Sequence, residues 1–472
     1  MNNQNSRSEK SIIGNLSAAF IANIITLVGN LSISLLLPKF IGVTQYSYYQ
    51  LYVFYASYVG FFSLGWTDGM YLRCGGAYYN AVDKSSIHGQ LRILTLLEMI
   101  FSLAVGFLAL TMENTDKSII IGLFGLCILV YIPRSFLHNL LQATNRVDKH
   151  ATGLIIDKVV HLFGIFLGIF AGQMHSTWFV VSDLIGRVFG GCYIFFVCRD
   201  VLSAPLCKIH KVRIEASENI RCGFILMISN VASMLIIGIV RQGIELFWDV
   251  ETFGKLSLTL SVSNMLMTFI NSIAMVLFPV LRRASTEDLN PLYRKMRIIL
   301  VSTIMGAMVF SYPIKRILCA WLPQYEEGLK YTAILFVMCI YESKMSMLIN
   351  TFLKTLRQER LLLRYNSISV LASLLLTIIT CGILRNLDLA VVSIVVLLAF
   401  RSTIAEIALS QKMGLQVKKD VLAEHLVASL FIVANWIIGG VSGMLIYASV
   451  YALFLFVNRN SLRDLVSGKI KH

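Results

Sequence analysis

Charged residues are scarce in this chain, and so are long polar segments. Only 14% of its 472 residues are Asp, Glu, Lys or Arg, whereas 57% are hydrophobic, and the mean hydropathy is +0.73. This composition is too apolar for a soluble domain. The nine cysteines include no CxxC pair, so we interpret them as small apolar packing residues and expect neither disulfides nor a bound metal.

The sequence also lacks a nucleotide-binding motif and a loop long enough to form a soluble domain. No Walker A pattern occurs, and the longest predicted cytoplasmic loop covers only about residues 199–219. A membrane polymerase or ligase would need a large external loop with a cluster of His, Asp or Glu at one membrane face. We therefore expect no enzyme, no catalytic residues and no cofactor.

What the sequence does contain is fourteen hydrophobic stretches, most with about the 20 residues that cross a hydrocarbon core. They cover residues 12–37, 46–72, 91–111, 118–140, 151–172, 176–198, 220–245, 253–281, 298–320, 331–353, 365–384, 388–411, 421–439 and 441–457. The pattern predicts an all-α polytopic membrane protein with about 14 transmembrane helices.

Lysine and arginine alternate between the gaps that separate these stretches. Of 41 such residues, 28 lie in alternate gaps and at the two ends of the chain, and only four lie in the intervening gaps: Lys39, Lys117, Lys330 and Arg385. Short cytoplasmic loops retain an excess of Lys and Arg, so both termini are predicted to be cytoplasmic. The net charge of +15 is spread over these loops, which favours contacts with membrane lipids over nucleic-acid binding.

The two halves of the chain show a faint internal repeat. Three pairs match in the same order: 40–47 with 247–254, 141–146 with 353–357, and Arg187 with Arg401. Six spans in each copy make a parallel repeat, as in rocking transporters with a substrate site between two bundles. The predicted parts are a six-helix bundle at 1–199, a cytoplasmic linker at 200–219, a second six-helix bundle at 220–411, and two additional helices with a basic cytoplasmic tail at 412–472.

Several short segments carry a family resemblance. They are Lys39-Phe40-Ile41-Gly42, Tyr46-Ser47-Tyr48, Leu64-Gly65-Trp66-Thr67-Asp68-Gly69 with Arg73, Phe253-Gly254, and Leu277-Phe278-Pro279. This pattern resembles Wzx-type polysaccharide flippases of the multidrug/oligosaccharidyl-lipid/polysaccharide exporter superfamily, over about residues 10–411. Two positions depart from it. Ser47 stands where the family usually has glycine, and Arg241-Gln242 replaces an acidic residue, which leaves the coupling ion open.

The resemblance implies a multi-pass protein of the bacterial cytoplasmic (inner) membrane. Its substrate would be a lipid-linked oligosaccharide repeat unit for O-antigen, other lipopolysaccharide or capsule. A polysaccharide polymerase and a chain-length regulator would be further partners. The first, second, seventh and eighth spans would line a cavity, which makes Arg241, Lys255 and Asp68 cavity candidates.

Nine basic residues remain within or at the ends of spans once the gaps are assigned. They are Arg134, Lys158, Arg187, Arg241, Lys255, Lys315, Arg316, Lys344 and Arg401. Their acidic or titratable companions are Asp68, Glu98, Asp157, His161, Asp183, Glu245, Glu342 and Glu406. Ionisable groups that face lipid are costly, so we expect these to face the bundle interior, a water-filled cavity or one another.

Spacing along a helix leaves several alternatives open for these groups. Asp183 with Arg187, and Arg241 with Glu245, are four residues apart and are equally well explained as self-satisfied pairs. Asp157 and His161 have the same spacing, which fits a proton relay or an interhelical hydrogen bond.

Neighbouring ionisable residues cannot pair on one helix surface. Asp157 and Lys158 point to different faces, as do Glu342 and Lys344, so each needs a partner on another helix. Lys315 and Arg316 lie near the outer end of the ninth span and are expected to reach the headgroups.

A cationic cavity suits a polyprenyl diphosphate that carries sugars, because Arg binds phosphate oxygens through a two-pronged fork and Lys acts as a point charge. The candidate substrate-binding residues are Arg401, Arg187, Arg241, Lys255, Arg134 and Lys344. The candidates for ion coupling are Asp68, Glu98, Asp157 and His161. We predict a flippase that works by alternating access. The alternatives are a cation-coupled multidrug exporter of the same architecture and a peptidoglycan-precursor flippase.

Overall fold

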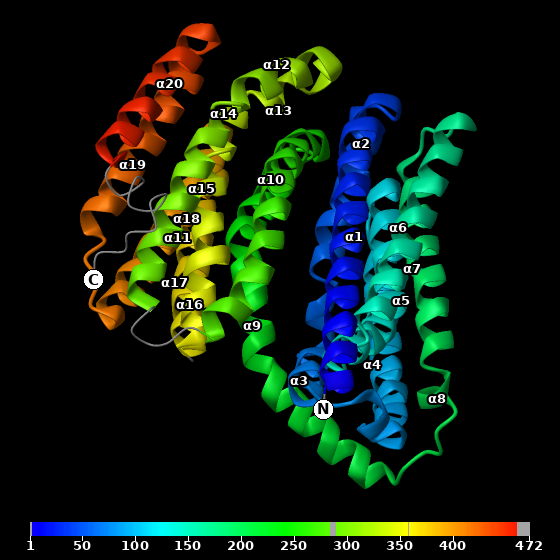
Figure 1. Cartoon of the computed structure of the whole chain (residues 1–472). Coiled ribbons are helices and arrows are strands. Elements are labelled where there is room, and N and C mark those ends of the chain that lie inside the picture. The colour runs from blue at the N-terminus through cyan, green and yellow to red at the C-terminus, as the bar shows by residue number, and fades with distance from the viewer. Residues whose placement is uncertain (1, 284–288, 357, 460–472) are drawn as a thin grey trace. The chain divides into compact units, whose positions relative to one another are not determined.

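Every regular element in the described part of the protein is a helix (Figure 1). This computed structural model describes the backbone of residues 2–283, 289–356 and 358–459, and the side chains of 21–265, 267, 289–356, 358 and 360–459. Within those ranges eleven helices are long and apolar enough to cross a membrane, or twelve if the bent pair Leu289–Met308 and Ser311–Trp321 forms one span. The predicted class, an all-helical polytopic membrane protein, is confirmed.

Two compact units make up the chain, Met1–Val231 and Ala232–His472. The first contains α1 (Asn2–Phe40), α2 (Val43–Ser57), α3 (Trp66–Cys74), α4 (Lys84–Leu110), α5 (Thr115–Ala143), α6 (Val147–Phe170), α7 (Ser176–Val197), α8 (Arg199–Leu202) and the start of α9 (Ile209–Phe247). Because α9 begins at Ile209, the second half of the predicted linker is helical. The predicted domain boundaries themselves stay a prediction.

The second unit contains the rest of α9 and the helices that follow it. They are α10 (Val250–Arg283), α11 (Leu289–Met308), α12 (Ser311–Trp321), α13 (Glu326–Leu329), α14 (Thr332–Leu335), α15 (Met338–Ser343), α16 (Asn350–Thr355), α17 (Glu359–Thr377), α18 (Leu387–Met413), α19 (Lys418–Ile432) and α20 (Gly440–Val457). Three π-helical segments interrupt this unit: η4 (Lys344–Ile349), η5 (Ile378–Ile383) and η6 (Val433–Ile438).

Each of the fourteen predicted spans falls on helical backbone, but not every span is one helix. The ninth is divided between α11 and α12, and the second is divided as well. Its helix α2 ends at Ser57, a short 3-10 segment (η1, Val59–Ser63) follows, and α3 begins only after Leu64 and Gly65. Both of these residues have positive φ, 52° and 80°, and this left-handed conformation cannot continue a right-handed helix. The eighth predicted span lies within α10, only part of which has described side chains.

Close packing against α9 explains this break. A Cβ added to Gly69 would lie 1.8 Å from the carbonyl oxygen of Asn219, and one added to Gly223 would lie 2.0 Å from the carbonyl oxygen of Gly65. The backbones of α3 and α9 therefore touch, which only glycine permits. The length of an apolar stretch predicts a span, but it does not reveal that α3 must pack closely against α9.

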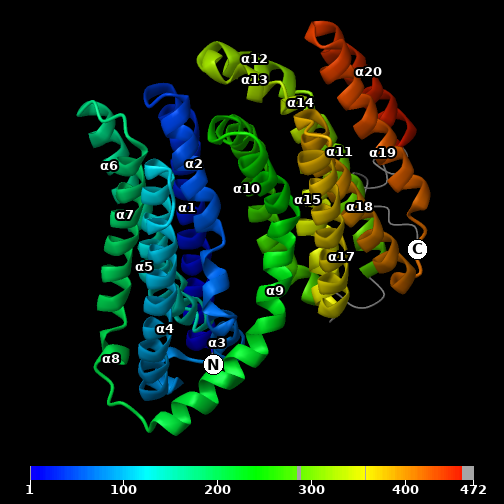
Figure 2. The ribbon, with the colours of Figure 1, turned by 180° about the vertical axis from the view of Figure 1, so that it is seen from behind.

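Helices α4, α5, α6 and α7 lie side by side within the first unit (Figure 2). Small residues bring α6 and α7 together, as is common between transmembrane helices. A Cβ added to Gly186 would lie 2.6 Å from the carbonyl oxygen of Asp157. This contact places the ionisable residues of α6 directly against α7.

Candidate functional site

In the first unit, His161 of α6 and Arg187 of α7 lie next to Asp183 of α7. Its carboxylate accepts hydrogen bonds from Tyr52 Oη (2.8 Å) and Arg187 Nε (2.6 Å), and His161 Nδ1 lies 3.3 Å away. We call Tyr52, His161, Asp183 and Arg187 the Asp183 cluster. The pair predicted from the four-residue spacing of Asp183 and Arg187 is thus present.

A second ion pair in this unit joins α5 to α6. Arg134 Nη2 donates to Asp157 Oδ2 at 2.7 Å, while the neighbouring Lys158 donates to Asn30 Oδ1 of α1 at 2.9 Å. Asp157 and Lys158 therefore find partners on different helices, as predicted. His161 lies against Asp183, and Asp157 lies against Arg134. The proton relay through Asp157 and His161 stays a prediction.

Glu98, on α4, is the exception among the buried acids. Its side chain is fully buried (0% exposed), and neither carboxyl oxygen has a hydrogen-bond partner in the described part of the chain. Burying an ionised carboxylate without a partner costs far more than burying a neutral group, so we expect Glu98 to carry a proton. Asp68 lies in the first turn of α3 and is half-buried.

In the second unit, Arg401 on α18 is almost completely buried, with 1% of its surface exposed. Its guanidinium donates to Glu342 Oε1 (2.9 Å), Asn366 Oδ1 (2.9 Å) and Ser233 Oγ (2.7 Å). The charge and both ends of the guanidinium are thus satisfied by groups on three other elements.

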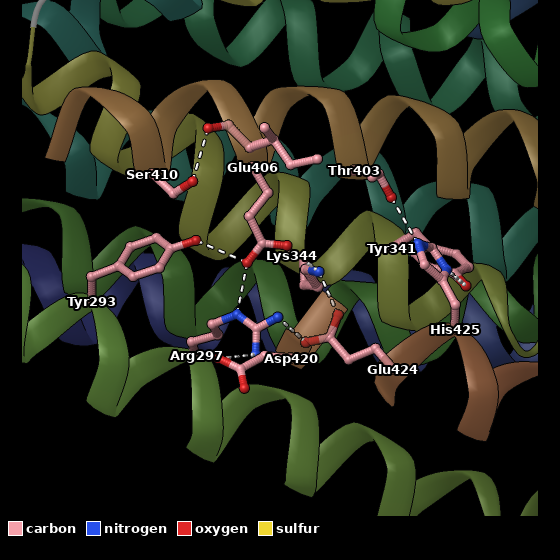
Figure 3. Close-up of polar contacts among 11 residues, drawn as sticks. Tyr293, Arg297, Tyr341, Lys344, Thr403, Glu406, Ser410, Asp420, Glu424 and His425 are labelled. Atoms are coloured by element: carbon pink, nitrogen blue, oxygen red, sulfur yellow. Dashed lines mark hydrogen bonds and ion pairs between the residues drawn. The ribbon is translucent and has the colours of Figure 1, made fainter. Parts of the chain in front are cut away.

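A closed ring of four charges lies nearby in this unit (Figure 3). Arg297 of α11 and Lys344 of η4 each contact both Glu406 of α18 and Glu424 of α19, so every cation bridges the same two carboxylates. The Arg297 to Glu406 distance is 2.7 Å, and Tyr293 donates to Glu406 at 2.9 Å. These four side chains are no more than 6% exposed. We call them the four-charge ring, and its formal charges cancel.

Two further candidate cations lie on α9 and α10. Arg241 Nη2 donates to Ser257 Oγ at 2.9 Å, and its guanidinium lies 5.1 Å from the centre of the Phe253 ring. Glu245, the predicted partner of Arg241, accepts a hydrogen bond from Gln242. Lys255 forms an ion pair of 2.6 Å with Glu327, whose side chain is 80% exposed.

Lys255 also lines a pocket of about 180 Å³ within the second unit. Glu327, Lys330 and Tyr331 form other parts of its wall. Tyr331 stacks on Trp436 with ring centres 5.4 Å apart, and Lys330 Nζ lies 4.7 Å from the Tyr331 ring centre. Cations beside an aromatic wall can bind a phosphorylated sugar, since the ring covers the sugar face while the ammonium groups meet the phosphate.

Sequence reasoning missed two members of the four-charge ring. It assigned Arg297 to a cytoplasmic loop because that residue immediately precedes an apolar run, yet its side chain is buried. It did not consider Glu424, although this acid lies inside the thirteenth predicted span. Five of the six candidate cations form an ion pair with a carboxylate: Arg134, Arg187, Lys255, Lys344 and Arg401.

Comparison by sequence finds no relative, since no protein-family model and no curated protein matches this chain. Solved structures do match. The lipid II flippase MurJ in an inward closed conformation has a TM-score of 0.66 at 15% identity, covering 96% of this chain and 100% of that chain.

Two further matches are transporters of the MOP superfamily. An inward-facing multidrug resistance MATE family transporter has a TM-score of 0.62 at 10% identity and covers 85% of this chain and 98% of that one. A MOP superfamily transporter from Pyrococcus furiosus has a TM-score of 0.52 at 10% identity, covering 86% and 96%. The chain therefore has the fold of these multi-pass membrane transporters.

Proposed function

We propose that this protein is a flippase that moves a polyprenyl-diphosphate-linked oligosaccharide repeat unit from the inner to the outer leaflet of a bacterial cytoplasmic membrane. The observation that carries the flippase part of the proposal is the likeness to MurJ, which extends over 96% of this chain and all of that flippase. The oligosaccharide repeat unit as substrate rests on the sequence resemblance. The MATE transporter in its inward-facing conformation covers only 85%. Bundle motion would give alternating access, and both termini would lie in the cytoplasm.

The substrate's diphosphate needs cations that are able to exchange a protein carboxylate for phosphate. Arg401 and Lys344 are poor choices because both are almost completely buried, and the two carboxylates that contact Lys344 are buried with it. Lys255 is better placed, since its partner Glu327 is largely exposed and a pocket with an aromatic wall adjoins it. The second cation that we assign to the diphosphate is Arg241, which donates a hydrogen bond to Ser257 of α10.

Proton coupling is the energy source that fits the buried acids best. Among the ion-coupling candidates, Glu98 combines complete burial with the absence of a described hydrogen-bond partner. A protonated Glu98 that ionises when water reaches it would link export to the proton gradient. Asp68, Asp157 and His161 remain further candidates, and a polysaccharide polymerase and chain-length regulator remain proposed partners.

The test uses cells that lack their own oligosaccharide flippase and make surface polysaccharide only when this protein is supplied with its matching repeat unit. We expect Arg241→Ala and Lys255→Ala to reduce surface polysaccharide by tenfold or more while the membrane level of the protein stays unchanged. Lys255→Arg, which keeps the charge, and Lys419→Ala, at an exposed cation, should retain export. Normal polysaccharide in the first two variants would contradict the diphosphate assignment.

A lipid II flippase is the second candidate, and the MurJ likeness favours it directly. Against it, the first span carries no charge between Lys10 and Lys39, whereas that class tends to have a basic first span. Growth of MurJ-depleted cells would support lipid II as the substrate, and failure to grow would support the longer repeat unit. Drug accumulation in an efflux-deficient host tests the multidrug alternative in the same way.

A further inference from the structure

Two cations near the outer end of the ninth predicted span are not used by the proposed transport site. Lys315 and Arg316 follow each other on α12, which is bent by 40° from α11. Neither forms an ion pair within the described part of the chain. Both line a cavity of about 140 Å³ in the second unit, together with Ser311, Tyr312 and Asn435. A water molecule occupies about 30 Å³ of liquid, so this cavity accepts a group of several heavy atoms.

The cavity also receives the beginning of α20. Gly439 and Gly440, which line it, have φ of 64° and 62°, and no side chain caps this helix. The first hydrogen bond back into the turn is from Gly443 N to Gly439 O, so the N–H groups of residues 440–442 have no acceptor within the helix. These N–H groups and the helix dipole favour an anion.

A buried hydroxyl gives an independent indication of a ligand. The Ser311 side chain is 97% buried, lines the cavity and has no hydrogen-bond partner within the described residues. Its oxygen is not among the fully buried unpartnered atoms of the described residues, so the cavity gives it access to a hydrogen-bond partner. A phosphate oxygen in the cavity would supply one.

The ionisable side chains that line this cavity are all basic, unlike those of three other cavities. No acidic side chain lines it. In three other cavities of the described chain, Glu424, Glu327 and Glu215 contribute carboxylates beside the cations. An anion entering the α12 cavity therefore displaces no protein carboxylate, which makes it better suited to a permanently bound group than the Lys255 pocket.

Exposed apolar side chains next to the lining residues along the chain indicate what carries the phosphate. Ile317 of α12, which follows Arg316, is 66% exposed. Ile437 of η6 and Val441 of α20, which flank Gly439 and Gly440, are 71% and 52% exposed. In Figures 1 and 2, α12 and the α19–α20 turn lie at the same end of this unit. A basic cavity whose lining residues have exposed apolar neighbours along the chain matches a phospholipid better than a free ion.

We propose that the cavity formed by Lys315, Arg316, Ser311 and the beginning of α20 is a binding site for the phosphate headgroup of an anionic phospholipid, with the acyl chains against the exposed apolar side chains of Ile317, Ile437 and Val441. The headgroup would hold α12 and the α19–α20 turn together. This site is separate from the transport site and does not depend on the proposed substrate.

The test measures lipid binding to the full-length protein by native mass spectrometry after delipidation, with phosphatidylglycerol or phosphatidylcholine added back. We expect one phosphatidylglycerol to bind more tightly than phosphatidylcholine. Lys315→Gln/Arg316→Gln should weaken that binding by about tenfold or more, because charge-assisted hydrogen bonds to phosphate are lost. The matched double variant Lys117→Gln/Arg385→Gln removes two cations from other outer gaps and should bind as the wild type does.

Further variants keep the test decisive if the double variant folds poorly. Lys315→Arg should retain binding, and Ser311→Ala, which removes only the hydroxyl, should weaken it a few-fold. Equal binding of both lipids, or unchanged binding in the variants, would overturn the proposal. Full competition by millimolar inorganic phosphate would show an anion site that does not need a lipid, and would overturn the assignment to a phospholipid.

Discussion

Arg187 and Arg401 occupy matching places in the two predicted repeats, yet they are neutralised in different ways. Arg187 pairs with Asp183 one turn earlier on the same helix, whereas Arg401 pairs with Glu342, Asn366 and Ser233, all on other elements. A pair within one helix leaves that helix free to shift without losing its counter-charge. The ties of Arg401 instead hold several elements together.

The same difference separates the larger clusters. The Asp183 cluster is partly open, with 12% of the Asp183 side chain and 17% of the Arg187 side chain exposed. The four-charge ring is closed and joins α11, η4, α18 and α19. In some proteins, buried ionic groups contribute more to a unique arrangement of the elements than to net stability. We infer that the second unit is internally braced, and that α19 belongs to its body.

The largest effect is expected for Lys344→Ala, which tests whether the four-charge ring braces the second unit. Loss of the Lys344 ammonium leaves two buried carboxylates without one of their cations. We therefore expect a loss of stability at least as large as that for breaking one buried ion pair, about 3–5 kcal/mol. Thermal unfolding in detergent and the monodisperse fraction in gel filtration measure it. Lys344→Met/Glu424→Gln removes one charge of each sign and should recover part of the loss. Wild-type stability of Lys344→Ala would contradict the bracing role.

The next effect compares the two arginines directly. Arg401→Ala leaves Glu342, Asn366 and Ser233 without their shared donor, and we expect a loss of about 3–5 kcal/mol. Arg187→Ala should cost clearly less, because Asp183 keeps Tyr52 and His161. The unfolding temperatures of the two variants, measured under identical conditions, show which arginine contributes more to stability. Equal losses would show that local and interhelical pairing are equivalent here.

A smaller effect is expected for Tyr52→Phe, which removes one hydrogen bond to Asp183 and preserves the ring. Hydrogen bonds between transmembrane helices contribute about 0.6 kcal/mol on average, so the unfolding temperature should fall only slightly. A loss as large as that of Arg187→Ala would mean that Tyr52, rather than Arg187, is the main partner of Asp183.

The smallest effect is a pH dependence at the edge of the first unit. Although burial alone would raise the pKa of Asp200, hydrogen bonds from Lys84 and Tyr79 hold it below its usual value. The stabilisation is therefore complete above the unfolded pKa of about 3.9 and is lost as the pH falls through the lower folded value. This exposed pair contributes about 0–1 kcal/mol. Unfolding curves of wild type and Asp200→Asn should converge below pH 4. A difference that persists there would contradict this origin.

Patterns along the chain predict the helical class and the positions of the spans, because hydrophobic length is a local property. They also predict that Glu342 and Lys344 need separate partners, and the structure confirms this with Arg401 for one and the ring for the other. The same reasoning explains the split between Asp157 and Lys158.

Local sequence patterns do not predict contacts between segments that are distant in the chain. The partners of Arg401 come from α9, α15 and α17, and nothing in the local sequence around Arg401 indicates them. The break at Leu64 and Gly65 depends on contact with α9, and the role of Arg297 depends on Glu424, more than a hundred residues away. Counting intramembrane acids alone would have found Glu424 but not its position in a ring.

The most direct test of the central claim is a translocation assay with purified protein. The full chain is reconstituted into vesicles that hold a fluorescent polyprenyl-diphosphate-linked oligosaccharide in both leaflets, and a membrane-impermeant quencher reports the inner fraction. We predict that wild-type protein makes the inner fraction accessible over time, while Lys255→Ala/Arg241→Ala vesicles behave like protein-free ones. Transfer in wild-type vesicles no faster than in empty vesicles would contradict a flippase function.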